Sequence, residues 1–200
     1  MEKLKILLVF AFTTMFSVSV YAQKISFDRI EEDGVRIIGV EKIVQKIDIA
    51  TYDFSLTVFS GFRSKDYYLM ISSIWKIEEN CVVMVKLGNG EIVKLVAKNV
   101  TVGQLDYPNY DPIIGSSSVS GVISTQKVYY YVSIYSIEND LLNKIEQYGI
   151  IKIRIAFGNT YYEKNWNYDK LGKFIKKSHN RLEEQLQKPH FSTKSIENGF

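Results

Sequence analysis

The segment from Lys127 to Phe157 constrains the fold of this chain most, because it predicts a strand, a helix and a second strand in succession. The helix is predicted over residues 137–148. Ser136 stands where an N-cap side chain accepts a hydrogen bond from the first helical turn. Gly149 stands where many helices end in a left-handed residue. The sequence therefore marks both ends of this helix.

The apolar residues of this segment follow first a helical and then a strand period. Within the helix they recur at i, i+1, i+4 and i+7 and form one stripe: Leu141, Leu142, Ile145 and Tyr148. After the helix they alternate with charged or small residues, as in a strand with one buried face: Ile151, Ile153, Ile155 and Phe157. We therefore expect the helix to lie on a sheet that contains the second strand.

The N-terminus predicts a secretory signal peptide over residues 1–22. Lys3 and Lys5 precede an apolar run, and Val20 and Ala22 are small enough for the cleavage site before Gln23. An N-terminal membrane anchor is the alternative, but the apolar run is short and is interrupted by Thr and Ser. No Cys follows the run, so we expect a chain exported to the periplasm or the extracellular space without a lipid anchor.

The mature chain has the size of one domain and a nearly neutral charge. We expect a single domain over residues 23–188 and a flexible tail over residues 189–200. Removal of Lys3, Lys5 and Glu2 lowers the formal charge from +3 to +2. Nucleic-acid binding requires a concentrated basic patch. We therefore expect no nucleic-acid partner and no transmembrane segment in the mature chain.

Most of the remaining sequence predicts short strands. The apolar or alternating runs cover residues 23–30, 35–40, 54–59, 66–77, 81–87 and 91–96. Residues 41–53 fit a short strand or one helical turn. The last element is an amphipathic helix over about 168–188, which Pro189 ends, and its apolar stripe faces either the sheet or a membrane surface. These elements predict an α+β domain of mainly antiparallel β-sheet, or a sandwich, with two helices.

Two turns join pairs of these strands. Asp33 and Gly34 predict a hairpin between the first two runs. The hairpin around residues 88–90 has three possible registers: Asn89 and Gly90 as the central pair, Gly88 and Asn89 as the central pair, or a three-residue turn with Gly90 left-handed. The sequence does not choose between them.

Aromatic residues give the sequence its main potential for binding. Residues 99–126 show no clear period and predict a long loop that carries Tyr107 and Tyr110. Residues 158–167 predict a second connection, with Tyr161, Tyr162 and Trp166. Exposed rings bind the apolar side of a sugar or anchor a protein contact. The alternative is that these rings cover the edge of the sheet under the last helix.

The sequence offers little for catalysis. Cys81 is the only cysteine, so the monomer has no disulfide, and its position in a strand predicts a buried small side chain. With only His179 and His190 besides, no metal-ligand spacing occurs. No phosphate-binding glycine motif and no Gly-x-Ser-x-Gly elbow is present. We therefore predict no catalytic residue, no metal and no cofactor.

Several features of layout resemble a group of small exported β-rich proteins of uncharacterised function in Bacteroidetes-type bacteria. The features are Lys-Ile-Ser-Phe-Asp after the signal peptide, the Asn-Gly hairpin, and the helix followed by Gly-Ile-x-Lys-Ile-Arg-Ile. The resemblance covers about two thirds of the mature chain. It implies a location in the cell envelope and supplies no activity.

These observations lead to two hypotheses on function. The first is a non-enzymatic exported binding or protein-interaction domain, whose partner is a glycan or an envelope protein. The alternative is a hydrolase that acts on glycans with two converging carboxylates. The acidic residues available to it near aromatic ones are Asp106, Asp111, Glu163 and Asp169.

Overall fold

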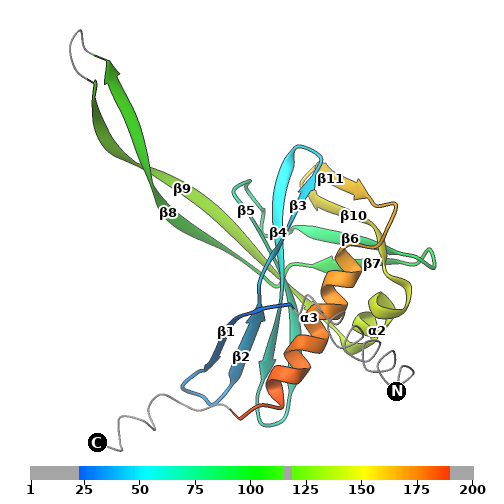
Figure 1. The fold of residues 1–200 in the computed structure, drawn as a ribbon. Helices are drawn as coiled ribbons and strands as arrows, with labels where there is room; N and C mark the ends of the chain where they lie inside the picture. The colour runs from blue at the N-terminus through cyan, green and yellow to red at the C-terminus, as the bar shows by residue number, and fades with distance from the viewer. Residues whose placement is uncertain (1–22, 115–118, 190–200) are drawn as a thin grey trace, which may run out of the picture.

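The computed structural model describes residues 23–114 and 119–189. The predicted signal peptide, the predicted tail beyond residue 189 and residues 115–118 lie outside this part of the chain. The described residues form eleven strands and two helices, and the strands make two antiparallel sheets (Figure 1). The predicted α+β class is confirmed.

The larger sheet has seven strands in the order β1-β2-β4-β5-β9-β8, with β3 pairing with β4 beside this path. Its strands are β1 (Ile25–Ile30), β2 (Arg36–Val40), β3 (Ile43–Ile47), β4 (Ala50–Ser60), β5 (Lys65–Ser73), β8 (Asn99–Ile114) and β9 (Val119–Ile137). The Asp33-Gly34 hairpin is confirmed between β1 and β2. The ambiguous residues 41–53 contribute β3 and the first part of β4.

The smaller sheet has four strands in the order β11-β10-β6-β7. They are β6 (Val82–Leu87), β7 (Ile92–Val96), β10 (Ile150–Phe157) and β11 (Thr160–Asn165). At the β6–β7 turn the Leu87 amide donates to the Glu91 carbonyl over 2.8 Å, and Gly90 has a φ of 92°. The hairpin therefore has the three-residue turn, the third of the registers that the sequence allows.

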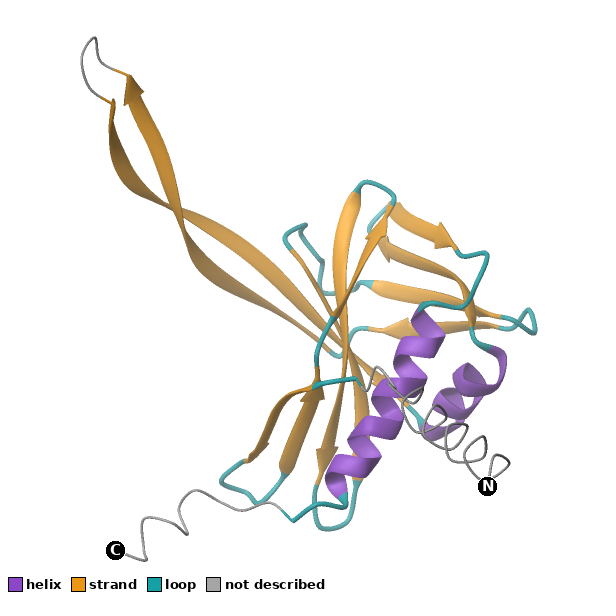
Figure 2. Cartoon of the chain, viewed as in Figure 1, coloured by secondary structure: helices purple, strands orange, loops and turns teal. Residues whose placement is uncertain are grey.

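The two helices pack beside each other and cover the core between the sheets (Figure 2). α2 (Asn139–Tyr148) contacts β6, and α3 (Leu171–Leu186) lies on β2 and β4. The predicted apolar stripe of α3 is buried through Leu171, Phe174, Ile175 and Leu182. The apolar stripe of α3 therefore packs on the sheet and not on a membrane surface.

One arginine anchors the end of α3 to the larger sheet. The Arg36 guanidinium in β2 forms an ion pair with Asp28 of β1 over 2.7 Å. It also donates to the carbonyl oxygens of Gln185, at 3.2 Å, and Lys188, at 2.9 Å. The last carbonyls of a helix have no partner within the helix. Arg36 supplies that partner and holds the C-terminal end of α3 against the sheet.

The prediction of a loop over residues 99–126 is wrong. β8 and β9 pair from Asn99 with Ile134 to Ile114 with Val119, and the two strands leave the body as a long twisted ribbon, called the arm here (Figure 1). Proline residues such as Pro108 and Pro112 would disrupt a strand in the middle of a sheet. β8 is the last strand of its sheet, where proline is tolerated.

The connection predicted for residues 158–167 is also wrong. Phe157 pairs with Thr160 across a turn of only two residues, Gly158 and Asn159, and the chain continues as β11. Several aromatic residues of this segment therefore lie on a strand, where successive side chains point to opposite faces.

Details of the strand–helix–strand segment also differ from the prediction. Ser136 lies within β9, and Glu138 is the N-cap of α2, without a side-chain capping bond. Tyr148 is 40% exposed instead of buried in the stripe. A register shift between Ile150 and Lys152 buries Ile150 fully and leaves Ile151 exposed. Beyond this bulge the predicted alternation holds, since Ile153 and Ile155 are buried.

Candidate functional site

The structure separates the five aromatic residues that the sequence singles out. The backbones of Tyr107 and Tyr110 lie on the arm, and their side chains are outside the described part of the chain. Tyr161 and Tyr162 are neighbours on β11 and point to opposite faces of the smaller sheet. Trp166 follows β11 and packs, half-buried, against the core. The arm points away from β11, so these residues form no common site (Figure 1).

A hollow of about 480 Å³ lies between the β5–β6 loop and the β10–β11 turn. It is called the aromatic hollow here. Its walls are Trp75, Lys76 and Glu78 from the loop, Gly158, Asn159 and Thr160 at the turn, and Tyr162 from β11. Among the sequence candidates whose side chains are described, Tyr162 alone lines it. Trp75, which is 43% exposed, is the ring that sequence reasoning missed.

The loop wall of the aromatic hollow is held at both ends. The Trp75 amide donates to Ser73 Oγ over 3.1 Å, and the Ser73 hydroxyl donates to the Thr51 carbonyl over 2.7 Å. Two residues after Trp75, Ile77 is buried in the core. The Cys81 amide then donates to the Glu78 carbonyl over 3.0 Å. The backbone that presents Trp75 and Glu78 is therefore fixed without a ligand.

The opposite wall is braced by the end of β3 and by the β3–β4 turn. The Glu163 amide on β11 donates to Asp48 Oδ2 over 2.7 Å, and Lys164 Nζ donates to the Lys46 carbonyl over 2.7 Å. At the rim, a Cβ placed on Gly158 would lie 3.5 Å from Glu78 Oε2. The Glu78 carboxylate therefore closes one side of the hollow, directly beside the turn.

The chemistry of the aromatic hollow is that of a binding site with two rings and several hydrogen-bonding groups. Trp75 and Tyr162 supply flat apolar surface, which packs against C–H groups of a ligand. Glu78 supplies an acceptor, and Asn159 and Thr160 each supply a donor and an acceptor. A few placed polar groups in an aromatic concavity are typical of a small-molecule site.

The four carboxylates of the hydrolase hypothesis are not brought together. Asp106 lies on the arm, as does the backbone of Asp111, whose side chain is outside the described residues. Asp169 Oδ1 accepts hydrogen bonds from the amides of Ile150, at 3.0 Å, and Gly172, at 2.7 Å, and so fixes the start of α3. It has a structural role.

The remaining carboxylate, Glu163, is unsuited to donate a proton. Hydrogen bonds from Lys152 and Arg154, at 2.9 Å and 2.6 Å, lower the pKa of the Glu163 carboxyl. Among the described residues that line the aromatic hollow, Glu78 is the single carboxylate. Glycoside hydrolysis requires a facing pair. The geometry therefore favours binding over hydrolysis in this hollow.

Cys81 and the histidine in the described region have structural surroundings. Cys81 is fully buried beside Val83 and Val85, as predicted, and burial raises the pKa of its thiol. A buried thiol is not available for a disulfide with another folded chain. His179 Nδ1 lies 2.7 Å from Glu146 Oε1 and joins α3 to α2. Among the side chains that the structure describes, no three His, Cys, Asp or Glu residues gather where they could hold a metal ion.

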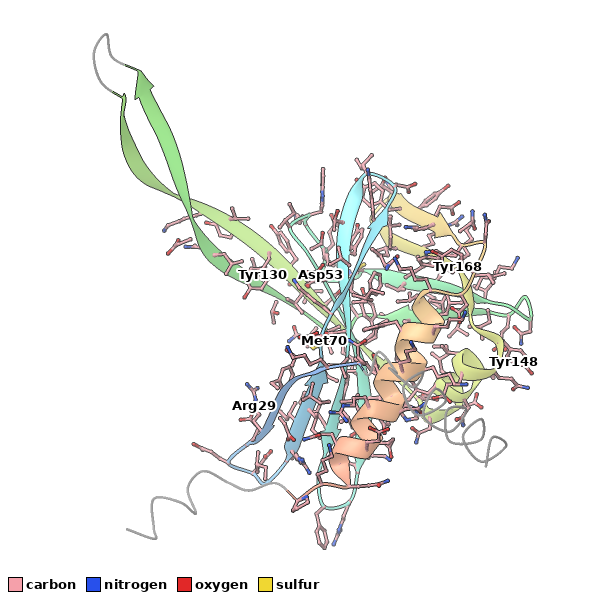
Figure 3. The ribbon with its side chains drawn as sticks, viewed as in Figure 1. Arg29, Asp53, Met70, Tyr130, Tyr148 and Tyr168 are labelled. Atoms are coloured by element: carbon pink, nitrogen blue, oxygen red, sulfur yellow. The ribbon has the colours of Figure 1, made fainter. Side chains whose placement is uncertain are left out.

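A second hollow, of about 370 Å³, lies where the arm joins the body. Tyr130 from β9 and Asp53 from β4 mark its two sides (Figure 3). Asp53 forms an ion pair with Lys42, and Ile74, Leu105 and Val132 add apolar surface. Because Ile74 lines this hollow and Trp75 lines the aromatic hollow, the same short loop borders both.

Comparisons with known proteins add no function to this geometry. No family model, no curated protein and no solved structure matches the chain. Neither helix of the described residues has the length and apolar character needed to cross a membrane.

Proposed function

We propose that this chain is a non-enzymatic, exported binding domain of the cell envelope, and that its aromatic hollow binds a glycan. The observation that carries the proposal is the placement of Trp75 and Tyr162 around one concavity, with Glu78, Asn159 and Thr160 on its rim. The signal-peptide pattern of residues 1–22 supports export.

A sugar fits this hollow because its two kinds of surface match the two kinds of lining. The C–H face of a pyranose ring packs on an aromatic ring, while its hydroxyl groups exchange hydrogen bonds with carboxylate, amide and hydroxyl side chains. Both walls are held by hydrogen bonds to the rest of the fold. Binding then requires little ordering of the protein, which favours affinity.

The test is binding of the chain from Gln23 onward to an array of neutral oligosaccharides of glucose, mannose, xylose and galactose. For the oligosaccharide that binds, calorimetry then compares the wild type with Trp75→Ala. Loss of the stacking surface is expected to weaken binding by about tenfold or more. The matched control is Tyr168→Ala, which removes a ring that is 66% exposed and lies outside the hollow.

The control variant is expected to bind like the wild type, and circular dichroism should show that both variants are folded. Binding that Trp75→Ala leaves unchanged would contradict the proposal. An array with no bound oligosaccharide would contradict it equally.

The arm supports a second candidate, contact with an envelope protein. Pairing of β9 with β5 ends at Tyr131, and beyond it the described parts of β8 and β9 pair only with each other. A two-stranded ribbon alone is marginally stable in water. Near its base Val102, Leu105 and Tyr129 are each at least half exposed. A partner that covers these side chains would stabilise the arm.

The second candidate has its own test. Envelope proteins are captured with the wild type and with the triple variant Val102→Ser/Leu105→Ser/Tyr129→Ser, which removes the exposed apolar side chains near the base of the arm. A partner that the wild type binds and the triple variant does not bind supports contact through the arm. Equal capture by both chains argues against it.

A further inference from the structure

The outward face of the smaller sheet carries four basic residues. The register places Lys152 of β10 opposite Lys86 of β6, and Arg154 of β10 opposite Met84. On the other side of Met84 lies Lys94 of β7. The alternate residues of these strands form the buried face, so the basic set points away from the core. This buried set is Val83, Val85, Leu95, Ile153 and Ile155. The outward set is called the basic face here.

Ion pairing accounts for only part of the charge on the basic face. Glu163 is its one carboxylate among the described residues, and it is already bound to both Lys152 and Arg154. Within the described chain, Lys86 and Lys94 form no ion pair. Like charges directly opposite each other, such as Lys86 and Lys152, destabilise a sheet. An anionic ligand would remove this repulsion.

A shallow depression of about 200 Å³ lies in the middle of the basic face. Its lining is Met84, Lys86, Ile92, Lys152 and Arg154, so three cations surround an apolar floor. Beside it the Arg154 guanidinium stacks on Tyr161, with Cζ 4.2 Å from the ring centroid. A fitting ligand has an anionic group next to C–H surface. The acidic units of a polysaccharide, with a carboxylate or sulfate on a sugar ring, have both.

We propose that the basic face binds acidic sugar units of a polysaccharide. The proposal rests on the proposed function in taking the ligand to be a glycan. A polymer fits better than a single sugar because Lys94, which lies on β7 two residues from Ile92 in the lining of the depression, offers a further cation. Tyr162 in the aromatic hollow and Tyr161 on the basic face are neighbours on β11. One polysaccharide that passes the β10–β11 turn would therefore contact both sites.

The test uses polygalacturonate as the acidic polymer and its methyl ester as the uncharged form of the same chain. The wild type from Gln23 onward is compared with the double variant Lys86→Gln/Lys94→Gln, in which no ion pair is broken. The wild type is expected to prefer the acid form. The double variant should bind it about tenfold more weakly and with a weaker dependence on salt. Its melting temperature should equal or exceed that of the wild type, because repulsion from Lys152 is relieved.

The charge-matched control is Lys176→Gln/Lys177→Gln, two exposed lysines of α3, which should bind like the wild type. The proposal is overturned if the wild type does not bind polygalacturonate, if it binds the methyl ester equally well, or if the double variant binds unchanged. Polyglutamate bound as tightly, with the same loss in the variant, would assign the face to acidic peptides instead.

The experiments distinguish a failure of the basic-face proposal from a failure of the proposed glycan binding at the aromatic hollow. Neutral oligosaccharides should still bind the Lys86→Gln/Lys94→Gln variant, because the aromatic hollow is intact. If neutral sugars bind and polygalacturonate does not, the basic-face proposal fails alone. If polygalacturonate binding depends on Lys86 and Lys94 while Trp75→Ala changes no binding, the aromatic hollow fails alone.

Discussion

Glu183 shows how single side chains join the helical layer to the larger sheet. Its carboxylate on α3 accepts hydrogen bonds from the Tyr67 hydroxyl and from Lys65 Nζ, the latter at 2.9 Å, both on β5. Burial raises the pKa of the Glu183 carboxyl, but the hydrogen bonds from Tyr67 and Lys65 outweigh it and leave this pKa below its ordinary value of 4.5. His179 Nε2 lies 4.0 Å away.

The lowered pKa predicts how stability depends on pH. A carboxyl whose pKa is lowered by folding stabilises the fold above the unfolded value of 4.5, and the contribution is lost as the pH falls through the folded value. Glu183→Gln should therefore cost about 1 kcal/mol at neutral pH, since solvent screens this partly exposed group. The difference from the wild type should shrink below pH 4.5.

Urea unfolding across this pH range is the measurement. The control is Glu184→Gln, at the neighbouring position, which is 64% exposed and pairs with Arg181 on its own helix. A difference between wild type and Glu183→Gln that stays constant from neutral to acid pH would show that the charge of this carboxylate contributes nothing.

Single residues also show how far the sequence predicts the aromatic hollow. The aromatic run 161–166 points to Tyr162, which lines the hollow. The sequence does not indicate Trp75 as a site residue, because residues 66–77 have the composition of one long strand. In the structure, β5 ends at Ser73. The exposure of Trp75 follows from the turn of the chain after Ser73, which is fixed by a hydrogen bond to Thr51 of another strand. Local sequence carries no signal of that contact.

At the scale of elements, the end of α2 packs closely on the β6–β7 turn. The Gly88 amide donates to the Gly149 carbonyl over 3.3 Å. A Cβ on Gly88 would lie 2.3 Å from the backbone carbonyl oxygen of Tyr148. A backbone carbonyl cannot move aside as the end of a flexible side chain can. Gly88→Ala should therefore destabilise the fold by about 1–3 kcal/mol, as overpacking does.

Thermal unfolding checks this prediction against Gly61→Ala. There the nearest atom to an added Cβ is Val35 Cγ2 at 3.7 Å, an ordinary contact, so the change should be small. If Gly88→Ala and Gly61→Ala have equal melting temperatures, α2 does not press on the turn as the structure indicates.

The arm explains the largest error of the sequence prediction. Strands are recognised by an apolar residue at every second position, because one face is buried. The outer part of β8 pairs with β9 alone among the described residues, so it needs no buried face and shows no such period. Its Gly, Ser and Pro residues are typical of a loop, so the sequence predicts a loop there. The pairing itself joins residues far apart in sequence, which no local pattern reveals.

The arm should be dispensable for the fold of the body. Asp106 is paired with Lys127, so replacing residues 107–126 by an Asn-Gly turn closes the hairpin at a matched position. We expect the melting temperature to change by no more than about 2 °C, because the buried core of the described residues, including Tyr135 and Ile137 of β9, is formed by residues outside 107–126. Circular dichroism on heating measures this change. A shortened chain that does not fold would show that the arm stabilises the body.

At the scale of the whole molecule, the sequence predicts the class and the local hairpins but not the division into two sheets. Alternation and turn residues indicate β1–β2 and β6–β7, whose partners are neighbours in sequence. The pairs β6–β10 and β5–β9 join distant segments. These two pairs decide which strands share a sheet, and hence bring the β5–β6 loop beside the β10–β11 turn. The aromatic hollow is a product of that topology.

The central claim is that a glycan binds at Trp75, and the two tryptophans of the chain allow a direct measurement. In a ¹⁵N-labelled chain from Gln23 onward, Trp75 and Trp166 give separate indole N–H signals. Trp75 lines the aromatic hollow, whereas Trp166 packs, half-buried, against the core. Titration with a bound oligosaccharide should shift the Trp75 signal and leave the Trp166 signal in place. A titration that saturates without moving the Trp75 indole would contradict the account.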